Sequence, residues 1–261
     1  MTDKIETSSR NDVFTIVLAD EANRNALSQQ LISEFISAID SAEEDESVRV
    51  VVVANRGHVF CAGADLKERT STELDSGTSD MAELFRRIMR SPKPFVGKIS
   101  GHAVAGGVGL AASFDISIAT ADSKFGFTEV RVGVAPAIIS VICLPKMRRA
   151  DAAAAFLRGN RFGAAEAARL GLINKALPAN ELDARVDEVV EDLVLGAPAA
   201  LAATKRLLTQ VPAMDFDEGL LWTADLSGTL FAGQEATEGM NAYLEKRQPA
   251  WVPDQNDELS Q

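Results

Sequence analysis

Histidine, cysteine and long hydrophobic runs are scarce in this chain of 261 residues, and each scarcity excludes a class of protein. Both cysteines, Cys61 and Cys143, lie in apolar stretches, where we expect buried reduced thiols rather than a disulfide, as in a cytoplasmic protein. The two histidines, His58 and His102, share no metal-ligand spacing with cysteines or acidic pairs, so we expect no metal site. No apolar run reaches the roughly 18 residues that a membrane-spanning helix needs.

Basic residues are outnumbered by acidic ones, with 26 Lys and Arg against 38 Asp and Glu, which gives a formal net charge of -12. Such a chain would repel the phosphates of nucleic acid. The polar, acidic start of the sequence, MTDKIETSSRND, resembles neither a secretory signal nor a typical transit peptide. A hydrophobic fraction of 46% is ample for one large core or a core with an appended lobe. We therefore expect a globular enzyme in the cytoplasm, with no nucleic acid or membrane as partner.

The first half of the chain alternates between strand and helix patterns. Val13–Leu18 alternates apolar and polar side chains, as a half-buried strand does. Val48–Ala54 is almost continuously apolar, which is typical of a buried parallel strand. Apolar residues recur at helical spacing from Leu27 to Ile39, with Ser28 available as N-cap. Further short strands are expected at Phe95–Ile99 and Asp115–Ala119.

The second half of the chain, from Met147 onward, has a helical pattern, including a helix at Gly163–Leu170 that Gly171 closes. The later helices are expected at Glu181–Leu195, Pro198–Gln210, Asp215–Phe231 and Glu235–Arg247. The polar stretch Glu68–Asp80 is expected to be a loop or a loosely held helix. These patterns predict an α/β core, placed at residues 1–195, and a helical C-terminal region at residues 196–261.

Two segments of small residues, Phe60–Asp65 (FCAGAD) and Ala103–Leu110 (AVAGGVGL), are the most informative feature. Their glycines allow the backbone to approach a ligand closely. The second segment also opens a helix, whose first N–H groups have no internal partner and carry partial positive charge. Two N–H groups from separate segments could hold a carbonyl oxygen as it becomes an enolate. This pattern indicates chemistry on an activated acyl group.

Five segments in order resemble the signatures of the crotonase (enoyl-CoA hydratase/isomerase) superfamily. They are Asn25–Ser28 (NALS), Phe60–Glu68 (FCAGADLKE), Ser100–Leu110 (SGHAVAGGVGL), Phe125–Pro136 (FGFTEVRVGVAP) and Glu238–Pro249 (EGMNAYLEKRQP). The resemblance implies a crotonase-like spiral of ββα units with a helical C-terminal region that builds a homotrimer or a hexamer. It also implies an acyl-CoA thioester as substrate and no separate cofactor.

Carried over residue by residue, the resemblance places the two oxyanion donors at the N–H groups of Ala64 and Gly106 and the acid/base at Glu129. It implies substrate-binding positions at Arg24, Ala26, Ala62, Asp65, Leu66, Lys67, Gly107, Gly109, Pro136 and Lys246. Coenzyme A is an anion, so local cations must offset the net negative charge. Arg24, Lys67 and the pair Lys246-Arg247 are candidates for this role, with solvated surface charges as the alternative.

The chain departs from the hydratase pattern at Gly109, where hydratases of the family carry a second glutamate. The small glycines downstream are also replaced, by Ala137, Ile138, Ile139 and Ser140, which changes the shape of the pocket. Hydratase or lyase chemistry is the leading interpretation. A Δ3,Δ2-enoyl-CoA isomerase that uses one glutamate and a non-catalytic acyl-CoA-binding homologue remain alternatives.

A third alternative, a dinucleotide-binding fold, is suggested by the G-x-G-x-x-A pattern of residues 107–112. The strand expected at Asp115–Ala119 leaves too few residues for the crossover helix of such a fold. A nicotinamide-dependent oxidoreductase is therefore disfavoured.

Overall fold

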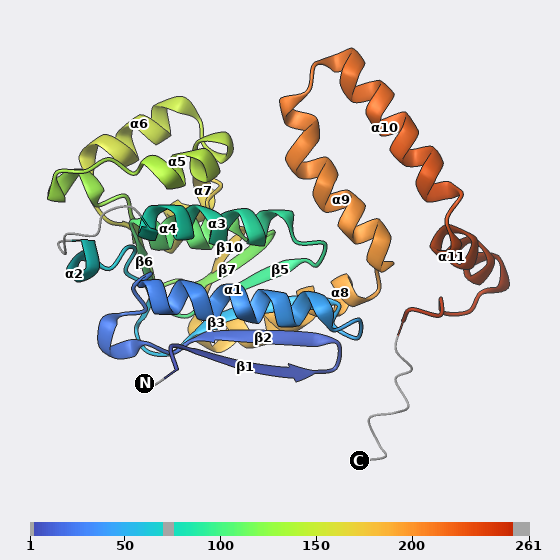
Figure 1. The fold of residues 1–261 in the computed structure, drawn as a ribbon, viewed down its shortest axis with the longest axis horizontal. Helices are drawn as coiled ribbons and strands as arrows, with labels where there is room; N and C mark the ends of the chain where they lie inside the picture. The colour runs from blue at the N-terminus through green and yellow to red at the C-terminus, as the bar shows by residue number, and fades with distance from the viewer. Residues whose placement is uncertain (1–2, 70–75, 253–261) are drawn as a thin grey trace.

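The computed structural model describes residues 3–69 and 76–252. Its larger sheet has the order β1-β2-β3-β5-β7-β10 and is parallel except for β1, which pairs antiparallel with β2 (Figure 1). Its strands are β1 (Ile5–Arg10), β2 (Val13–Leu18), β3 (Val50–Asn55), β5 (Phe95–Ile99), β7 (Ile116–Thr120) and β10 (Lys175–Leu177). The α/β class expected from the sequence is confirmed.

A smaller sheet, of order β4-β6-β8-β9, contains the strands that do not belong to the larger sheet. These are β4 (Val59–Cys61), β6 (His102–Val104), β8 (Lys124–Gly126) and β9 (Phe162–Gly163), of which β9 alone is antiparallel to its neighbour. The chain thus gives one strand to each sheet and then forms a helix, three times in succession. These helices are α2 (Leu66–Arg69) with α3 (Ser76–Arg90), then α4 (Gly106–Ser113), then α5 (Ala137–Cys143). The predicted spiral of ββα units is confirmed.

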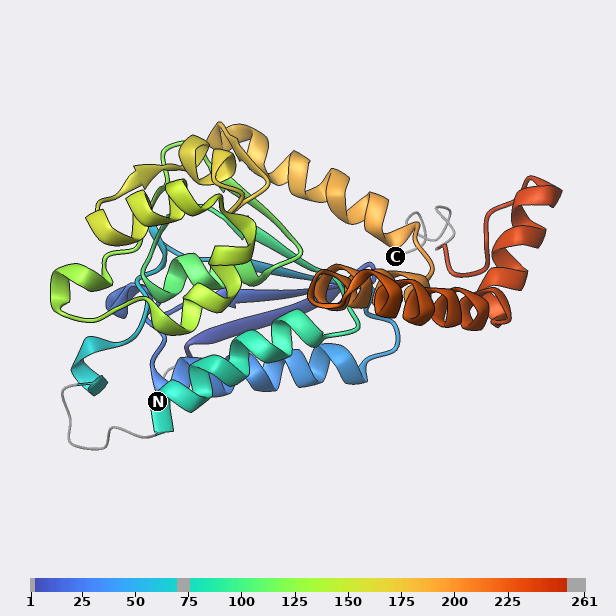
Figure 2. The same cartoon turned by 90° about the horizontal axis from the view of Figure 1, so that it is seen from above.

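Both faces of the larger sheet are covered by helices (Figure 2). Helix α1 (Gln29–Glu44) lies over one face, where Val51 and Val53 of β3 join the main hydrophobic core. Helix α8 (Leu182–Val194) lies over the other face, where Val50 and Val52 form a second core. Successive side chains of a strand point to opposite faces, so β3 has to be apolar at every position.

The remaining helices follow the spiral. They are α6 (Arg149–Arg158), α7 (Ala164–Arg169), α9 (Pro198–Gln210), α10 (Phe216–Phe231) and α11 (Gln234–Glu245). Short 3₁₀ helices occur at Glu21–Asn23, Glu129–Val132, Leu144–Lys146, Ala179–Glu181 and Val211–Ala213. Helices α9 to α11 extend away from the two sheets as an arm (Figures 1 and 2). Asp215 caps α10, because its side chain accepts a hydrogen bond from the N–H of Glu218 at 2.8 Å.

The expectation for the polar stretch Glu68–Asp80 needs completion. Helix α3 begins at Ser76, inside the polar stretch Glu68–Asp80 that was expected to be a loop or a loosely held helix, and it continues to Arg90, where no helix was predicted. Leu84 and Ile88 nonetheless anchor this helix in the main core. The part of the stretch at residues 70–75 lies outside the described residues. Within those residues, no helix has the length and apolar character needed to cross a membrane.

Candidate active site

The three segments expected to carry the chemistry meet at the carboxyl ends of adjacent parallel strands. Cys61 of β4 is in register with Ala103 of β6, which is in register with Phe125 of β8. Ala64 lies three positions after Cys61, and Gly106 lies three positions after Ala103. Glu129 lies four positions after Phe125. In α/β proteins the loops at this edge of a parallel sheet are the usual place for a ligand. One edge of the small sheet therefore brings all three residues together.

The backbones of the first two segments are in direct contact. A Cβ atom on Gly63, whose φ is +85°, would lie 2.8 Å from the nitrogen of Gly106. A Cβ on Gly106 would lie 3.6 Å from the nitrogen of Ala64. The two nitrogens are therefore neighbours, and in the part of the chain that the structure describes neither donates a hydrogen bond to a protein acceptor. Two adjacent free N–H groups form the donor pair that an oxyanion hole requires.

The residue before Gly106 has an unusual backbone. Ala105 has φ 51° and ψ −126°, angles that residues with a side chain rarely adopt. Its own N–H donates to the carbonyl of Gly126 at 2.9 Å, which ties the turn to β8. This turn starts α4 at Gly106, so the N–H of Gly106 belongs to the positive end of a helix.

The loop at residues 24–27 holds the first segment in place. The N–H of Leu27 donates to the carbonyl of Gly63 at 2.8 Å, and the N–H of Ala62 donates to the carbonyl of Arg24 at 3.1 Å. Asn25 is fully buried, and its Nδ2 donates to the carbonyls of Arg56 and Val59, at 3.2 and 2.7 Å. Asn25 entered the expected site only as part of the segment Asn25–Ser28. Its buried amide is the brace between this loop and β4.

Glu129 begins the 3₁₀ helix that follows β8. Its Oε2 atom is buried and has no hydrogen-bond partner within the described part of the chain. Burial raises the pKa of this carboxyl above its usual range, because water is replaced by apolar surroundings that disfavour the charged form. A carboxyl with a raised pKa and an unused oxygen is suited to take up and return a proton.

Gly109 and Gly107 of α4 pack against neighbouring elements. A Cβ on Gly109 would lie 2.2 Å from Cγ2 of Ile139, on α5, so a side chain at this position has no room. A Cβ on Gly107 would lie 2.1 Å from the carbonyl oxygen of Cys61, on β4. The replacement of the family's downstream glycines therefore fills the space beside Gly109 with an isoleucine.

The other expected binding residues differ in their exposure and in their distance from the strand ends. Ala26 and Pro136 are buried, Ala62 is partly buried, and Arg24, Leu66 and Lys67 are exposed near the same strand ends. The carboxylate of Asp65 accepts from Nδ2 of Asn23 at 2.6 Å and from the N–H of Lys67 at 2.8 Å, so it caps α2. Lys246 lies at the end of α11, on the opposite side of the chain from α2 (Figures 1 and 2). Within one chain it does not join the site.

The cysteines and histidines take structural positions. Cys61 and Cys143 are free and buried, as expected, and burial raises the pKa of each thiol to about 12. Nδ1 of His102 accepts from the N–H of Lys124 at 3.2 Å, and the N–H of His102 donates to the carbonyl of His58 at 3.0 Å. These contacts hold β6 between its neighbours.

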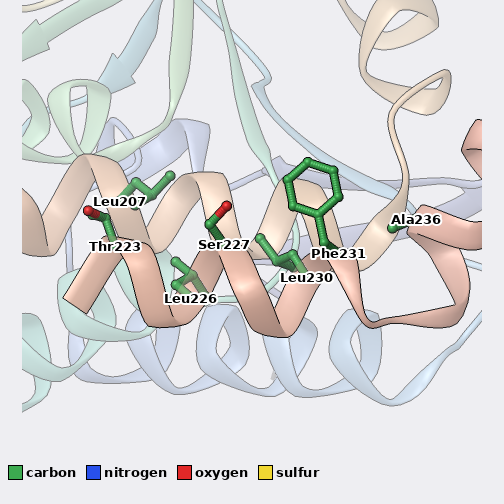
Figure 3. A pocket seen from close by; sticks show the side chains of 7 residues that line it. All are labelled: Leu207, Thr223, Leu226, Ser227, Leu230, Phe231 and Ala236. Carbon is green, nitrogen blue, oxygen red and sulfur yellow. The ribbon is translucent and has the colours of Figure 1, made fainter. Parts of the chain in front are cut away.

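An apolar hollow of about 470 Å³ lies between α9 and α10 of the arm (Figure 3). Its lining residues are Leu207, Thr223, Leu226, Ser227, Leu230, Phe231 and Ala236. None of these side chains can exchange a proton at neutral pH. The hollow is therefore unsuited to acid/base chemistry, and the strand ends remain the candidate active site.

Comparisons with known proteins cover nearly the whole chain. The family model described as Enoyl-CoA hydratase/isomerase matches residues 8–254. A Bacillus subtilis protein named probable enoyl-CoA hydratase is 33% identical over 245 residues, which span 91% of this chain and 95% of that protein. A crystal structure of enoyl-CoA hydratase from Mycobacterium smegmatis has a TM-score of 0.90 at 29% identity, covering 96% of this chain and 99% of that one. A second, from Mycobacterium avium, has a TM-score of 0.74 at 41% identity, covering 96% and 100%.

Proposed function

Because the chain belongs to the enoyl-CoA hydratase/isomerase family of enzymes, we propose that it hydrates a 2-enoyl-CoA thioester at the carboxyl ends of β4, β6 and β8. The observation that supports this most directly is that three groups follow the carboxyl ends of these adjacent parallel strands. They are the free N–H groups of Ala64 and Gly106 and the buried carboxyl of Glu129.

In the proposed reaction the thioester oxygen accepts hydrogen bonds from Ala64 and Gly106. Glu129, as carboxylate, takes a proton from water while the water oxygen bonds to C3. The electron pair of the double bond moves toward the thioester oxygen, which becomes an enolate held by the two N–H groups. The carboxylic acid of Glu129 then returns the proton to C2, and the enolate collapses to the 3-hydroxyacyl thioester.

Isomerisation of a 3-enoyl-CoA is the second candidate, and the contact between Ile139 and Gly109 favours it. That contact leaves no room for a carboxylate at position 109 of α4. A single carboxylate suffices to remove a proton from C2 and return it at C4, through a dienolate whose oxygen is held by the same two N–H groups. Both reactions thus use the same three groups and differ in whether water enters.

Coenzyme A binding and assembly complete the proposal. The exposed cations Arg24 and Lys67 lie near the strand ends and would meet the phosphates of coenzyme A, with no separate cofactor needed.

The core at residues 1–195 would carry the chemistry. The region at 196–261 would build a homotrimer or a hexamer, because its arm exposes large apolar side chains such as Leu221 and Leu244. Sedimentation of the Leu221→Asp variant tests this, with a lower mass expected than for the wild type.

Purified protein assayed with a neutral 2-enoyl-CoA and its 3-enoyl isomer tests the activity. Loss of the ultraviolet absorbance of the conjugated thioester indicates hydration, and its appearance from the 3-enoyl substrate indicates isomerisation. Glu129→Gln should abolish either signal, whereas Glu44→Gln, at the end of α1, should not. Thioester binding without turnover of either substrate would contradict the proposal and favour the non-catalytic alternative.

A further inference from the structure

The peptide unit between Gly63 and Ala64 supplies one proposed oxyanion donor, and the protein holds its other end. The carbonyl oxygen of Gly63 accepts a hydrogen bond from the N–H of Leu27 at 2.8 Å. This peptide bond is trans, so the unit is planar and its N–H points away from its C=O. A hydrogen bond that fixes the carbonyl of Gly63 therefore also fixes the direction of the Ala64 N–H.

The second donor is oriented within its own segment. The N–H of Gly106 belongs to the peptide unit that begins at Ala105, whose carbonyl accepts from the N–H of Val108 at 2.9 Å. That bond joins residues of one turn, so it forms when α4 begins. The donor at Ala64 depends instead on Leu27, which comes from a different part of the chain. The position of Leu27 therefore decides where the Ala64 N–H points.

Leu27 is placed by a loop that Asn25 anchors. The side chain of Asn25 is fully buried, and its Nδ2 donates to the carbonyls of Val59 at 2.7 Å and Arg56 at 3.2 Å. Leu27 follows two residues later and pairs with Ala64 in a parallel bridge. Among uncharged side chains, only Asn and Gln have two donor hydrogens on one nitrogen. The amide of Asn25 is therefore suited to hold two carbonyls at once.

Asn25 has two unfavourable features in this position. Its φ of 51° lies in the left-handed region, where residues with a side chain are uncommon. Its Oδ1 atom is buried and has no hydrogen-bond partner in the part of the chain that the structure describes. A buried polar atom without a partner destabilises a fold. Glycine would suit the backbone and avoid the unpartnered oxygen, so the value of Asn25 lies in the two carbonyls that its amide holds.

We propose that Asn25 is a positioning residue for the oxyanion donor at Ala64. Its amide fixes the loop at residues 24–27 against the start of β4, and Leu27 of this loop holds the carbonyl of Gly63. The same hydrogen bond polarises the peptide unit, which makes the Ala64 N–H a stronger donor. Asn25 acts through these residues and takes no part in proton transfer. The inference rests on the proposed function, since it takes Ala64 as an oxyanion donor.

Asn25→Gly tests the inference, because glycine adopts a positive φ readily and the variant removes only the amide. A donor displaced by about 1 Å can lower the rate by up to about 100-fold. We therefore expect kcat with the 2-enoyl-CoA to fall about 10- to 100-fold, while the Kd of the saturated thioester butyryl-CoA changes little.

Infrared difference spectra of bound butyryl-CoA, isotopically labelled at its thioester carbonyl carbon, report the oxyanion contact without turnover. Hydrogen bonds to a carbonyl oxygen lower its stretching frequency. The frequency of the bound thioester should therefore be higher in Asn25→Gly than in the wild type. A residue that only stabilised the fold would not change this frequency.

Asn174→Ala is the matched control, because it also removes an amide that binds the backbone. Oδ1 of Asn174 accepts from the N–H of Ser117, in the larger sheet, at 2.7 Å. This variant should have a lower Tm and an unchanged kcat and carbonyl frequency. Asn25→Asp is a second test variant, which keeps the volume of the side chain but turns only oxygens toward the two carbonyls. It should show the same losses as Asn25→Gly.

The inference is overturned if kcat and the carbonyl frequency are unchanged in the Asn25 variants, or if Asn174→Ala shows equal losses. Failure of both Asn25 variants to fold would also overturn it, because Asn25 would then be required for the fold itself. Turnover that is equal in the wild type and Asn25→Gly contradicts this inference alone. A frequency that differs between the two, without turnover of any enoyl-CoA, contradicts the proposed reaction and leaves the inference standing.

Discussion

Ile139 occupies the space into which any side chain at Gly109 would have to extend. The two residues come from successive helices, α4 and α5, and a Cβ on Gly109 would lie 2.2 Å from Cγ2 of Ile139 and 2.8 Å from its Cβ. The contact involves the base of a branched side chain, so rotation of Ile139 cannot relieve it. The large side chain of Ile139 on α5 and the lack of a side chain at Gly109 on α4 thus depend on each other.

Gly109→Glu is expected to destabilise the protein and not to create hydratase activity. Overpacking a core costs about 1–3 kcal/mol, and a buried carboxylate adds to this. The urea midpoint of unfolding measures the loss, and Gly163→Glu, where no atom lies within 4 Å of the added Cβ, is the control. Adding Ile139→Ala to Gly109→Glu should recover stability. A stable single variant would show that the contact is not restrictive.

Gly106→Ala should fold and lose most of its activity. The new methyl carbon would lie 3.3 Å from Cα of Gly63, a tight but tolerable contact, and 3.6 Å from the nitrogen of Ala64. It would therefore stand beside the N–H of Ala64, the other proposed oxyanion donor. Alanine keeps the backbone N–H of position 106, so the loss comes from the methyl group, which keeps the oxyanion away from the donor pair; losing one such contact typically lowers kcat about 100-fold or more. Steady-state rates of Gly106→Ala and of the control Gly163→Ala measure the effect, and equal rates would refute the placement of the oxyanion hole.

Glu129→Gln should lower turnover by at least about 100-fold, since general acid–base catalysis contributes at least that much. The amide keeps the volume of the carboxyl but takes up no proton at neutral pH. Binding of a saturated thioester, measured by calorimetry, should change little. If turnover survives, another group is the base.

The same substitution should stabilise the fold at neutral pH. Burial raises the pKa of Glu129, so the folded state holds its proton more tightly than the unfolded state does. The stability that this proton confers is present below the unfolded pKa and is lost as pH rises through the folded pKa. Glutamine carries no such cost. Thermal unfolding at pH 4 and pH 8 should therefore give a higher Tm for Glu129→Gln at pH 8 and a smaller difference at pH 4.

Coenzyme A affinity should fall with added salt, despite the acidic chain. Arg24 is exposed at the strand ends, and salt screens such exposed phosphate contacts over a Debye length of about 10 Å at 0.1 M. Arg24→Gln should weaken binding and flatten the salt dependence, whereas Arg10→Gln should do neither. Titrations of coenzyme A at several ionic strengths provide the measurement. An affinity independent of salt would exclude a phosphate contact at Arg24.

Long elements with a clear period were predictable from the sequence. Strands β2 and β5 and helix α9 have the expected bounds, and Ser28 caps α1, where its side chain accepts from the N–H of Leu31. Strands β4, β6 and β8 have three residues each, too few to display a period of two. The sequence pattern therefore did not predict the small sheet, whose strand ends carry the candidate site.

Within the site, glycine and glutamate positions could be inferred, but long-range packing could not. Ala64, Gly106 and Glu129 were indicated by motif segments and proved to lie at one sheet edge. The contact between Gly109 and Ile139 joins residues 30 positions apart, and the local sequence of neither segment predicts it.

The alignment of Cys61, Ala103 and Phe125 across the small sheet bears on how insertions can be accommodated. An extra residue between Cys61 and Ala64 would advance that donor by about 3.3 Å relative to Gly106, more than a hydrogen bond can span. An extra residue between Ala121 and Asp122, which are exposed in the turn between β7 and β8, lies upstream of the paired position and leaves the spacing to Glu129 intact. The length of the chain is thus constrained in the few positions after each paired residue, whereas the turn between β7 and β8 can accommodate an insertion.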